Sequence, residues 1–549
     1  MVDYAYIGPC TGDREAVIAT LTEQHWPEIA VDTEAITVKN QTIIGIGLMY
    51  GPHRLYVRTF PELTDAVPIV MHLISRPDIT KIYHNCFYDL RALTELADEE
   101  GFVEPDVSNL IDTSFMAKVS GRSAALEDNS RELLNFSNEY SIKELLAEAG
   151  RGATMLDVPF EKVAKKCLND VWATYNLASA FNLTPAQRDC YEVDIKMARL
   201  LLHMEGKGLL LDQPKLSETR ERLKRSVVQL ADICSAEGFN PGSPQQVGYV
   251  LASRGNILPF TKSRRSLRTD DETLSDCDDP LAQTVLDYRK ATKLLGTYVE
   301  PWIGKERAST HFRMDLSTGR IASFDRNLQN IPPDMRGIFL PDDMVWSWFD
   351  YSQIELRCLA AIAGDSTMTM AYANGQDLHQ MTADAAGVSR QDAKTFNFAK
   401  VYGASDRMLA RRTTVPKERI RELRAAWDKL YPDAAYWINS RMRTHGDTVE
   451  TYYGRKMLLP QEKEGMNTGR GFEIHVANCA VNYSVQGTAA DIMKRAMLHL
   501  DDSPDFRLQI HDEALVNGYY DFNNRGLESI CPDIPTPIEA KFGPLWIKG

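Results

Sequence analysis

Two aspartates in the C-terminal half stand where strands are expected to end or turn. Asp350 follows the apolar run MVWSWF, and Asp512 lies in a short connection between the apolar segments 506–510 and 514–516. If these segments are neighbours in one sheet, the two carboxylates meet, which is unfavourable unless a divalent cation lies between them. A two-metal site of this kind activates a hydroxyl for attack on a phosphate. The alternative is that each aspartate only caps or turns its own segment.

A second set of residues lies on one face of an expected helix over 389–403. Arg390, Lys394, Phe398 and Tyr402 recur every four residues, and Ser389 is suited to cap the N-terminus. Cations in a first turn oppose the helix macrodipole, so an anionic ligand would relieve that conflict. Two cations followed by two aromatics suit a nucleoside triphosphate. The alternative is a basic first turn on an ordinary amphipathic helix.

The elements that must position these residues fall into three stretches. Apolar runs predict strands at 29–31, 42–50 and 54–57, with helices near 62–75 and 87–98, which is an α/β pattern. Long helices begin at about 184, which predicts a domain boundary near 182. Beyond 310 the pattern is mixed, with a strand over 344–349, a helix over 353–363 and two strands over 506–510 and 514–516.

Composition limits the function classes. The chain has 549 residues, 44% hydrophobic and 25% charged, which is typical of a folded protein of several domains. Its nine cysteines are scattered without a CxxC pair, which excludes a disulfide scaffold, and no Walker-type GxxxxGK[ST] sequence occurs. No apolar run is long enough to span a membrane and no secretory signal is apparent, so a cytoplasmic location is expected. The net charge of −14 argues against nucleic acid, but clustered carboxylates can hold cations and local basic surfaces can meet phosphates.

Three segments together carry a family resemblance. FDYSQIELR (349–357), RQDAKTFNFAKVYG (390–403) and LQIHDEALV (508–516) resemble the three polymerase motifs of family A DNA polymerases, the bacterial polymerase I and phage group. Supporting stretches follow in the expected order over roughly 185–549, at 240–251, 317–332, 377–387 and 484–497. The resemblance implies a DNA-directed DNA polymerase with a right-hand fold.

The resemblance also implies roles for individual residues. Asp350 and Asp512 would bind the metal ions with Glu513 beside them, and Lys394 would act as a catalytic residue that protonates the leaving pyrophosphate. Glu355 resembles a steric gate against ribonucleotides. The expected nucleotide-binding residues are Arg390, Lys394, Phe398, Tyr402, Glu355, Tyr351, Gln353 and His379, and the expected DNA-binding residues are Arg320, Gln486, His511 and Asn482. Asn478 stands where many relatives carry Arg, so a template or primer contact is expected to be lost or replaced there.

The N-terminal stretch supplies a second set of carboxylates. Asp32, Glu34, Asp89 and Asp170 could converge as ligands for two metal ions. With YHNCFYDL (83–90) and SIKELL (141–146), they resemble the DEDD 3′-to-5′ proofreading exonucleases, which have a ribonuclease-H-like fold. Lys166 stands where the third motif of that family usually has Tyr. The carboxylates could still cleave slowly, or another residue could orient the water.

These inferences define an expected architecture. The fold class is multidomain α/β and α+β, with a ribonuclease-H-like exonuclease domain over 1–182 followed by a polymerase domain over 183–549. Within the latter we expect a thumb over about 183–310, a palm over about 311–365 and 435–549, and fingers over about 366–434. We expect no 5′-nuclease before the exonuclease domain, which together with the compact length is typical of a phage or plasmid replicative enzyme, with a bacterial repair enzyme as the alternative.

The expected cofactors are two Mg²⁺ ions at each site, which Mn²⁺ could replace. The expected partners are primer-template DNA and dNTPs, with a helicase or single-strand binding protein as further replisome partners and a monomeric state. Two rival hypotheses stay open: a chain acting mainly as an exonuclease, and a catalytically silent DNA-binding protein of the replisome. The joint presence of Asp350, Asp512 and the Arg390-to-Tyr402 face favours the polymerase.

Overall fold

The N-terminal part of the chain is built on one six-stranded sheet. The computed structural model describes residues 2–6, 14–23, 25–37, 40–261, 263, 265–462, 469–500, 504–523 and 525–547. The strand order is β1-β4-β3-β2-β5-β6, antiparallel from β4 to β2 and parallel at both edges. The strands are β1 (Val2–Tyr6), β2 (Glu28–Ala35), β3 (Ile43–Tyr50), β4 (His53–Arg58), β5 (Thr80–Tyr83) and β6 (Leu110–Asp112).

Helix α7 (Phe160–Ala180) packs directly across β2 and β3 of this sheet. The close approach depends on Gly47, because a Cβ there would lie 2.6 Å from Cys167 Sγ. The other helices around the sheet are α1 (Arg14–Glu23), α2 (Val67–Ser75), α3 (Cys86–Glu100), α4 (Thr113–Val119), α5 (Leu126–Leu133) and α6 (Ile142–Ala149). Helix α2 is shorter than the helix expected near 62–75, because it begins at Val67, with Pro68 in its first turn.

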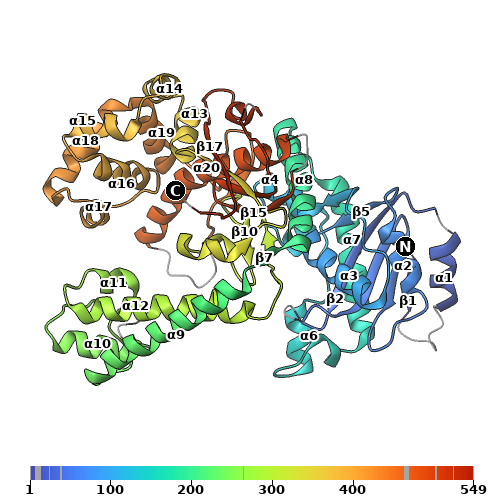
Figure 1. The fold of residues 1–549 in the computed structure, drawn as a ribbon. Helices are drawn as coiled ribbons and strands as arrows, with labels where there is room; N and C mark the ends of the chain where they lie inside the picture. The colour runs from blue at the N-terminus through green and yellow to red at the C-terminus, as the bar shows by residue number, and fades with distance from the viewer. Residues whose placement is uncertain are drawn as a thin grey trace.

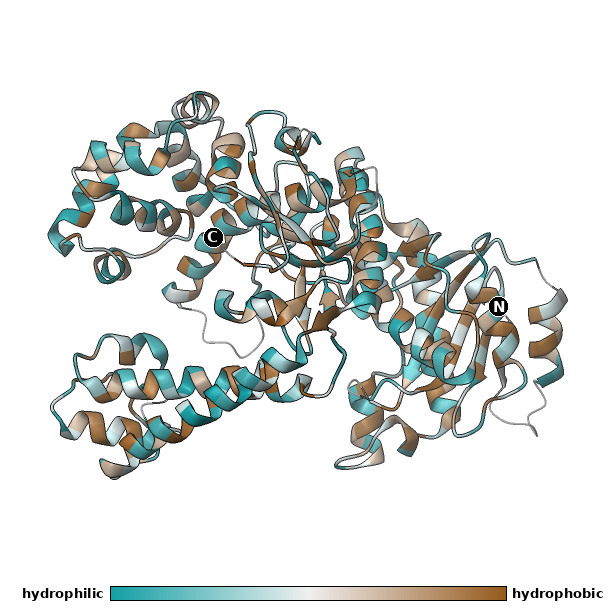
Figure 2. Ribbon diagram, viewed as in Figure 1, coloured by the Kyte–Doolittle hydropathy of each residue, from teal (hydrophilic) through white to brown (hydrophobic). Residues whose placement is uncertain are grey.

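A long helix leads out of this part into an extended helical lobe. Helix α8 (Pro185–Lys207) begins as expected, with Thr184 and Gln187 forming a capping box. Helices α9 (Gln213–Ala236), α10 (Pro244–Ser253), α11 (Asp271–Ser275) and α12 (Pro280–Leu294) form the lobe at the lower left of Figure 1, with α9 packed along α12. In Figure 2, α9 carries long hydrophilic stretches, whereas the strands of the N-terminal sheet are largely hydrophobic.

A four-stranded antiparallel sheet lies at the centre of the C-terminal half. Its order is β15-β16-β12-β17, with β12 (Trp346–Tyr351), β15 (Phe506–Ile510), β16 (Glu513–Asn517) and β17 (Ile538–Gly543). Helices α13 (Ile354–Ala363) and α20 (Arg470–His499) pack against each other beside it. Short pairings complete this region: β7 (Leu209–Leu211) with β8 (Arg307–Ala308) and β11 (Phe339–Leu340), β9 (His311–Arg313) with β10 (Ala322–Phe324), and β13 (Thr448–Glu450) with β14 (Lys456–Leu458).

A second helical lobe, orange at the upper left of Figure 1, is inserted between α13 and α20. It comprises α14 (Ser366–Ala373), α15 (Leu378–Ala386), α16 (Arg390–Val401), α17 (Asp406–Arg412), α18 (Ile420–Leu430) and α19 (Pro432–Arg443). Within the described residues, no helix is both long and apolar enough to cross a membrane.

A buried charge network joins α8 to α20. The Asp194 carboxylate accepts from Arg455 at 2.6 and 2.9 Å and from Lys494 at 2.8 Å, and Arg455 also donates to Asp491 at 2.8 Å. All four side chains are at most 5% exposed. Two cations and two anions alternate, so each buried charge is compensated, whereas removal of one member would leave an uncompensated charge.

Candidate active sites

Strand register brings Asp350 and Asp512 together. Asp350 pairs with Glu513 across β12 and β16, and the backbone N–H of Tyr351 donates to the Asp512 carbonyl at 3.0 Å. Asp512, in the turn that leads into β16, therefore lies one residue from the position directly opposite Asp350 on β12. Both are only partly exposed, and carboxylate oxygens are the ligands that Mg²⁺ prefers. This donor set fits a divalent-cation site.

The hairpin that carries Asp512 has a two-residue connection. Ile510 pairs with Glu513, so His511 and Asp512 form the whole loop, which is one residue shorter than the predicted connection because Glu513 belongs to β16. His511 adopts φ 51°, a left-handed conformation that is uncommon for a residue other than glycine. Gln509 Nε2 donates to the His511 carbonyl at 2.5 Å, which helps to hold the turn. The tight turn leaves His511 exposed beside the two carboxylates.

Glu513 is held by other parts of the fold. Its two carboxylate oxygens accept from Arg336 Nη1 at 3.0 Å each, and Oε1 also accepts from Trp546 Nε1 at 2.5 Å. The side chains of Glu513 and Arg336 are 7% and 6% exposed. The sequence predicts Glu513 as a catalytic residue, but its carboxylate is committed to a buried ion pair. Neither Arg336 nor Trp546 carried a local sequence signal for this contact.

Tyr351 and Gln353 stand at the start of the next segment. The Tyr351 side chain is 3% exposed and its hydroxyl donates to the Leu527 carbonyl at 2.9 Å, so the side chain lies in the core rather than beside Asp350. Gln353 precedes α13 with φ 53° and accepts a hydrogen bond from Tyr372 at 3.4 Å. The Tyr351 side chain therefore has a packing role, and its nucleotide contact stays a prediction.

Four predicted site residues form one hydrogen-bonded network. The Tyr402 hydroxyl lies 2.7 Å from both carboxylate oxygens of Glu355, and Arg320 donates to the same carboxylate at 2.5 Å. Gln486 Nε2 donates to the Tyr402 hydroxyl at 3.0 Å. Burial and the negative charge of Glu355 raise the pKa of Tyr402 to about 12, so the phenol stays protonated. The network joins α13, the end of α16, α20 and the 314–321 loop.

Helices α15 and α16 place cations beside a buried histidine. Arg390 Nε donates to Asp377 at 2.6 Å, and the neighbouring His379 shares a 3.0 Å hydrogen bond between its Nδ1 and Asn397. His379 Nε2 is buried and has no hydrogen-bond partner within the described residues. Burial lowers the pKa of His379 to about 4, assisted by Arg390 and Lys394. The ring of Phe398 lies 5.7 Å from that of His379.

Helix α16 matches the predicted segment. Ser389 caps its N-terminus by accepting from the Asp392 backbone N–H at 3.0 Å, and Lys394 is exposed one turn later. At its other end Gly403, with φ 65°, lies against Asn478, since a Cβ there would be 2.1 Å from Asn478 Oδ1. Asn478 thus packs on the end of α16. Asn482 and Gln486 follow at four-residue spacing on the same face of α20.

The four predicted carboxylates of the N-terminal part also converge. Asp32 and Glu34 lie on β2, Asp89 is in the first turn of α3, and Asp170 is on α7. Asp89 Oδ1 accepts from the backbone N–H and the hydroxyl of Thr33, at 2.9 and 2.7 Å. Burial raises the pKa of Asp89 to about 7, although the Thr33 hydrogen bonds lower it. Burial and the charge of Asp170 raise the pKa of Asp32 well above its usual range.

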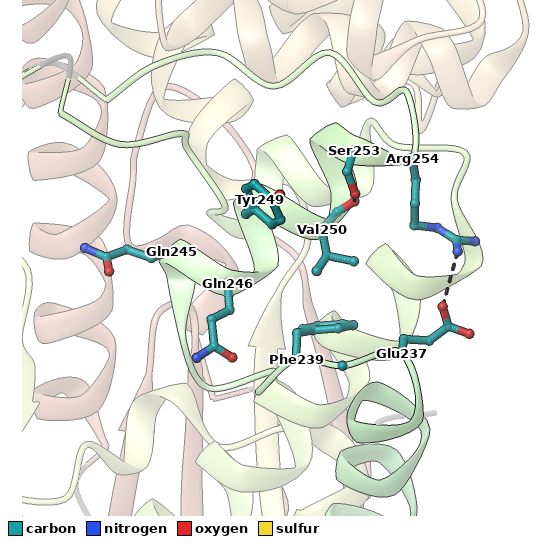
Figure 3. A pocket seen from close by; sticks show the side chains of 9 residues that line it. Glu237, Phe239, Gln245, Gln246, Tyr249, Val250, Ser253 and Arg254 are labelled. Atoms are coloured by element: carbon teal, nitrogen blue, oxygen red, sulfur yellow. Dashed lines mark hydrogen bonds and ion pairs between the residues drawn. The ribbon is translucent and has the colours of Figure 1, made fainter.

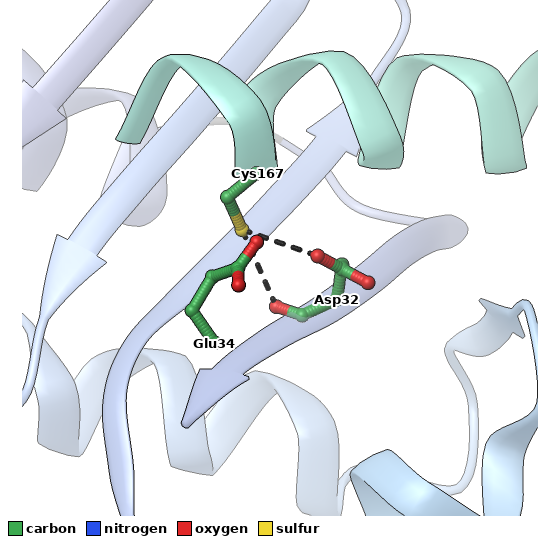
Figure 4. A group of neighbouring side chains, drawn as sticks. All are labelled: Asp32, Glu34 and Cys167. Atoms are coloured by element: carbon green, nitrogen blue, oxygen red, sulfur yellow. Dashed lines mark hydrogen bonds between the residues drawn. The ribbon is translucent and has the colours of Figure 1, made fainter. Parts of the chain in front are cut away.

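Two side chains of α7 enter this cluster. Lys166 Nζ lies 2.7 Å from Glu34 Oε1 and 2.6 Å from Asp170 Oδ2. Cys167 Sγ lies 3.4 Å from Asp32 Oδ2, and Figure 4 shows Cys167 pointing toward Asp32 and Glu34. Burial disfavours the charged amine, but Glu34, Asp170 and Asp32 prevail and raise the pKa of Lys166 well above its usual range. Burial raises the pKa of the Cys167 thiol, which favours a neutral donor. This donor set, with an ammonium between two carboxylates, does not fit the two-ion arrangement that we expected.

A surface pocket at the far end of the α9–α12 lobe is separate from both carboxylate sites. Figure 3 shows Phe239 and Tyr249 along its wall and the ion pair of Arg254 with Glu237, 3.4 Å apart, at one side. Tyr249 is 75% exposed. No predicted site residue lines this pocket.

Family models match most of the chain. A model described as DNA polymerase family A matches residues 213–524, and a model described as 3′-5′ exonuclease matches residues 11–184. The two matches confirm the expected order of an exonuclease domain followed by a polymerase domain. Both kinds of domain are generally dependent on divalent metal ions.

Bacterial DNA polymerases are among the proteins similar to this chain. DNA polymerase I of Caldicellulosiruptor bescii is 31% identical over 63% of this chain and 46% of its own length, and DNA polymerase I of Chloroflexus aurantiacus is 28% identical over 95% and 61%. The chain thus spans about half to three fifths of these curated relatives. A solved structure, the POL domain of Pol1 from M. smegmatis in complex with DNA primer-template and dNTP, has a TM-score of 0.74 at 21% identity and covers 99% of both chains. That likeness shows the fold, and the expected phage character finds no support among these relatives.

Proposed function

The chain belongs to DNA polymerase family A, and we propose that it extends a primer on a DNA template by transferring nucleotides from dNTPs to the primer 3′-hydroxyl. The observation that carries this proposal is the register of β12 and β16, which sets Asp350 opposite Glu513 and so next to Asp512 in the preceding turn. These carboxylates would hold two Mg²⁺ ions, whose chemistry when bound is to activate the 3′-hydroxyl and stabilise the leaving pyrophosphate. Mn²⁺ could replace them.

The α15–α16 surface would bind the incoming nucleotide. Arg390 and the exposed Lys394 offer positive charge to the triphosphate, and neutral His379, buried behind this surface with no Nε2 partner among the described residues, would assist in binding the nucleotide. Lys394 would give a proton to the leaving pyrophosphate. Phe398 lies beside His379, in a position to contact the sugar. Gln353, at the start of α13, would assist from the opposite side.

The Glu355 network would decide which sugar and which base enter. Glu355 is held between Arg320 and Tyr402, so its position is fixed and it can exclude a 2′-hydroxyl by steric conflict. Tyr402 would stack near the templating base. Gln486, Asn482 and His511 lie on α20 and the β15–β16 turn, where they would contact the primer-template together with Arg320.

We assign the domains as the sequence predicts them. Residues 1–182 would form the exonuclease domain, and 183–549 the polymerase domain, with a thumb over about 183–310, a palm over about 311–365 and 435–549, and fingers over about 366–434. The α9–α12 lobe, the four-stranded sheet and the α14–α19 lobe support this division. We further propose that the protein acts in DNA replication as a cytoplasmic monomer, with a helicase or single-strand binding protein as partners.

The N-terminal domain supports a second activity, the removal of nucleotides from a 3′ end. Asp32, Glu34, Asp89 and Asp170 converge in a domain that matches the 3′-5′ exonuclease model. Because Lys166 occupies the cluster, we expect trimming to be slow compared with extension.

A single labelled substrate tests both activities. A 5′-labelled primer-template is incubated with Mg²⁺, with and without the four dNTPs, and the products are sized on a gel. Extension with dNTPs that is lost in Asp512→Asn supports the polymerase, and slow shortening without dNTPs that is lost in Asp32→Ala supports the exonuclease. Shortening without any extension would favour an exonuclease-dominant protein, and no change in either lane would favour a silent DNA-binding role.

A further inference from the structure

The Lys166 ammonium lies where a cation would bridge two carboxylates of the exonuclease domain. Its Nζ is 2.7 Å from Glu34 Oε1 and 2.6 Å from Asp170 Oδ2, and its side chain is only 10% exposed. A divalent cation between the same oxygens would stand at 2.0–2.6 Å from each, roughly the same position. The ammonium and a divalent ion therefore compete for one space, and the ammonium is covalently part of the chain.

The surrounding contacts fix Lys166 in this position. Lys166 and Asp170 are one turn apart on α7, so they share a face of the helix. Asn138 Nδ2 donates to the second oxygen of Asp170 at 2.8 Å and to the Lys166 carbonyl at 3.2 Å. Gly47 lets α7 approach the sheet closely, which brings the ammonium to Glu34 on β2. Movement of the lysine out of the cluster would leave Glu34 and Asp170 buried without a counter-ion.

The next residue of α7 reaches a third carboxylate. Cys167 Sγ lies 3.4 Å from Asp32 Oδ2, and the Sγ atom and the oxygens of Asp32 and Glu34 lie within 4.8 Å of one another (Figure 4). A thiol is a poor ligand for Mg²⁺, which prefers oxygen. The α7 face thus directs an ammonium and a thiol at three of the four carboxylates.

We propose that Lys166 replaces one divalent ion of the exonuclease domain, so that this domain binds at most one divalent ion and is held together by an internal cation. The inference rests on the exonuclease activity proposed above only for its consequence, which is slow trimming. The replacement of one divalent ion by the Lys166 side chain does not depend on whether the protein cleaves DNA.

The first test counts ions without any change at Lys166. The full chain carrying Asp350→Asn and Asp512→Asn, which removes the polymerase-site ligands, is titrated with Mn²⁺, and free Mn²⁺ is followed by electron paramagnetic resonance. At most one bound ion per chain, lost in Asp32→Asn if present, supports the inference. Two bound ions that are both lost in Asp32→Asn would overturn it.

The second test uses melting temperature and matched variants in the same background. In Lys166→Met the carboxylates lose their internal cation, so we expect a lower melting temperature in EDTA that Mn²⁺ raises by several degrees. Lys166→Arg keeps the charge, and Lys165→Met removes a lysine whose side chain is 52% exposed and pairs with Glu139 at the surface. Both controls should respond to Mn²⁺ as the parent does. An equal Mn²⁺ response in the parent and in Lys166→Met would contradict the inference.

The two proposals fail separately. A chain that does not extend or trim DNA would leave the Mn²⁺ count unchanged, and a count of two ions would leave extension unchanged. If Lys166→Met does not fold, the ion count on the parent decides the question.

Discussion

The buried ion pair of Arg336 and Glu513 allows us to predict the effect of replacing Glu513, which lies next to the proposed catalytic carboxylates. In Glu513→Gln the carboxylate that accepts twice from Arg336 becomes a neutral amide, while the guanidinium stays buried. One amide oxygen can still accept a hydrogen bond, but the amide N–H₂ group is a donor and cannot accept one from Arg336 or Trp546. The main effect is therefore an uncompensated buried charge.

The size of the effect follows from the burial of both partners. Breaking a buried ion pair from one side lowers the free energy of unfolding by about 3–5 kcal/mol. At an unfolding entropy of about 2.1 cal/mol/K per residue, each kcal/mol changes the melting temperature of a domain as large as 183–549 by only about 1.3 °C, so we expect a decrease of roughly 4–6 °C. Extension at a temperature where the variant is folded should persist, because Glu513 is tied to Arg336 and Trp546 rather than to the metal site.

The measurement compares thermal unfolding and primer extension in four proteins. Glu422→Gln is the matched control, because that side chain is 74% exposed and its change should stay within about 0.5 kcal/mol. Arg336→Met combined with Glu513→Gln removes both charges and should recover much of the loss. The reasoning would be refuted if Glu513→Gln abolished extension without lowering the melting temperature, since Glu513 would then act on the ions.

Three further outcomes are expected. Asp350→Asn should abolish primer extension in a protein that still unfolds cooperatively, because an amide is a poor ligand for the metal ions that this position would hold; retained extension would contradict the palm site. Tyr402→Phe should lower the free energy of unfolding by about 1–3 kcal/mol in denaturant titration, since Glu355 and Gln486 lose their shared partner, and an unchanged midpoint would show the network to be dispensable. Despite its burial, Arg455 and Lys494 lower the pKa of Asp194, so the ionised carboxylate stabilises the folded protein above about pH 4, and this stabilisation is lost as the pH falls further. The difference in free energy of unfolding between the parent and Asp194→Asn should therefore shrink below about pH 4. A difference that stays constant with pH would refute this.

Local sequence signals predicted the individual elements near the polymerase site. Ser389 caps α16 and Thr184 caps α8 as their positions suggested, because a capping side chain bonds to a backbone only three residues away. The β15–β16 hairpin was also predictable, since two apolar runs around a tight connection can hardly pair otherwise. The N-terminal limit of α2 was less accurate, although Pro68 in its first turn is a signal that the helix begins there.

The roles of several charged side chains depended on distant partners. In the sequence, Lys166 stands out only as a departure from the family pattern. Its contact with Glu34 could not be predicted, because Glu34 lies 132 residues away on another element. Glu513 was expected to be catalytic, but Arg336 is 177 residues from it in the chain and carries no motif of its own. A buried charge must find a counter-charge, but the sequence does not say which one the packing will bring near.

By itself, the sequence determined which residues could hold metal ions, the order of the two domains, and the helices and strands on which most site residues stand, because periodicity, caps and turns act over a few residues. The tertiary structure decided which carboxylates lie near each other and which lie against a cationic side chain of the chain itself. Asp350 and Asp512 meet through strand register, whereas Glu34 and Asp170 are bridged by Lys166 and Glu513 by Arg336. These pairings depend on the packing of α7 against β2 and of the 333–338 segment against β16, because this packing brings together residues that are far apart in the chain.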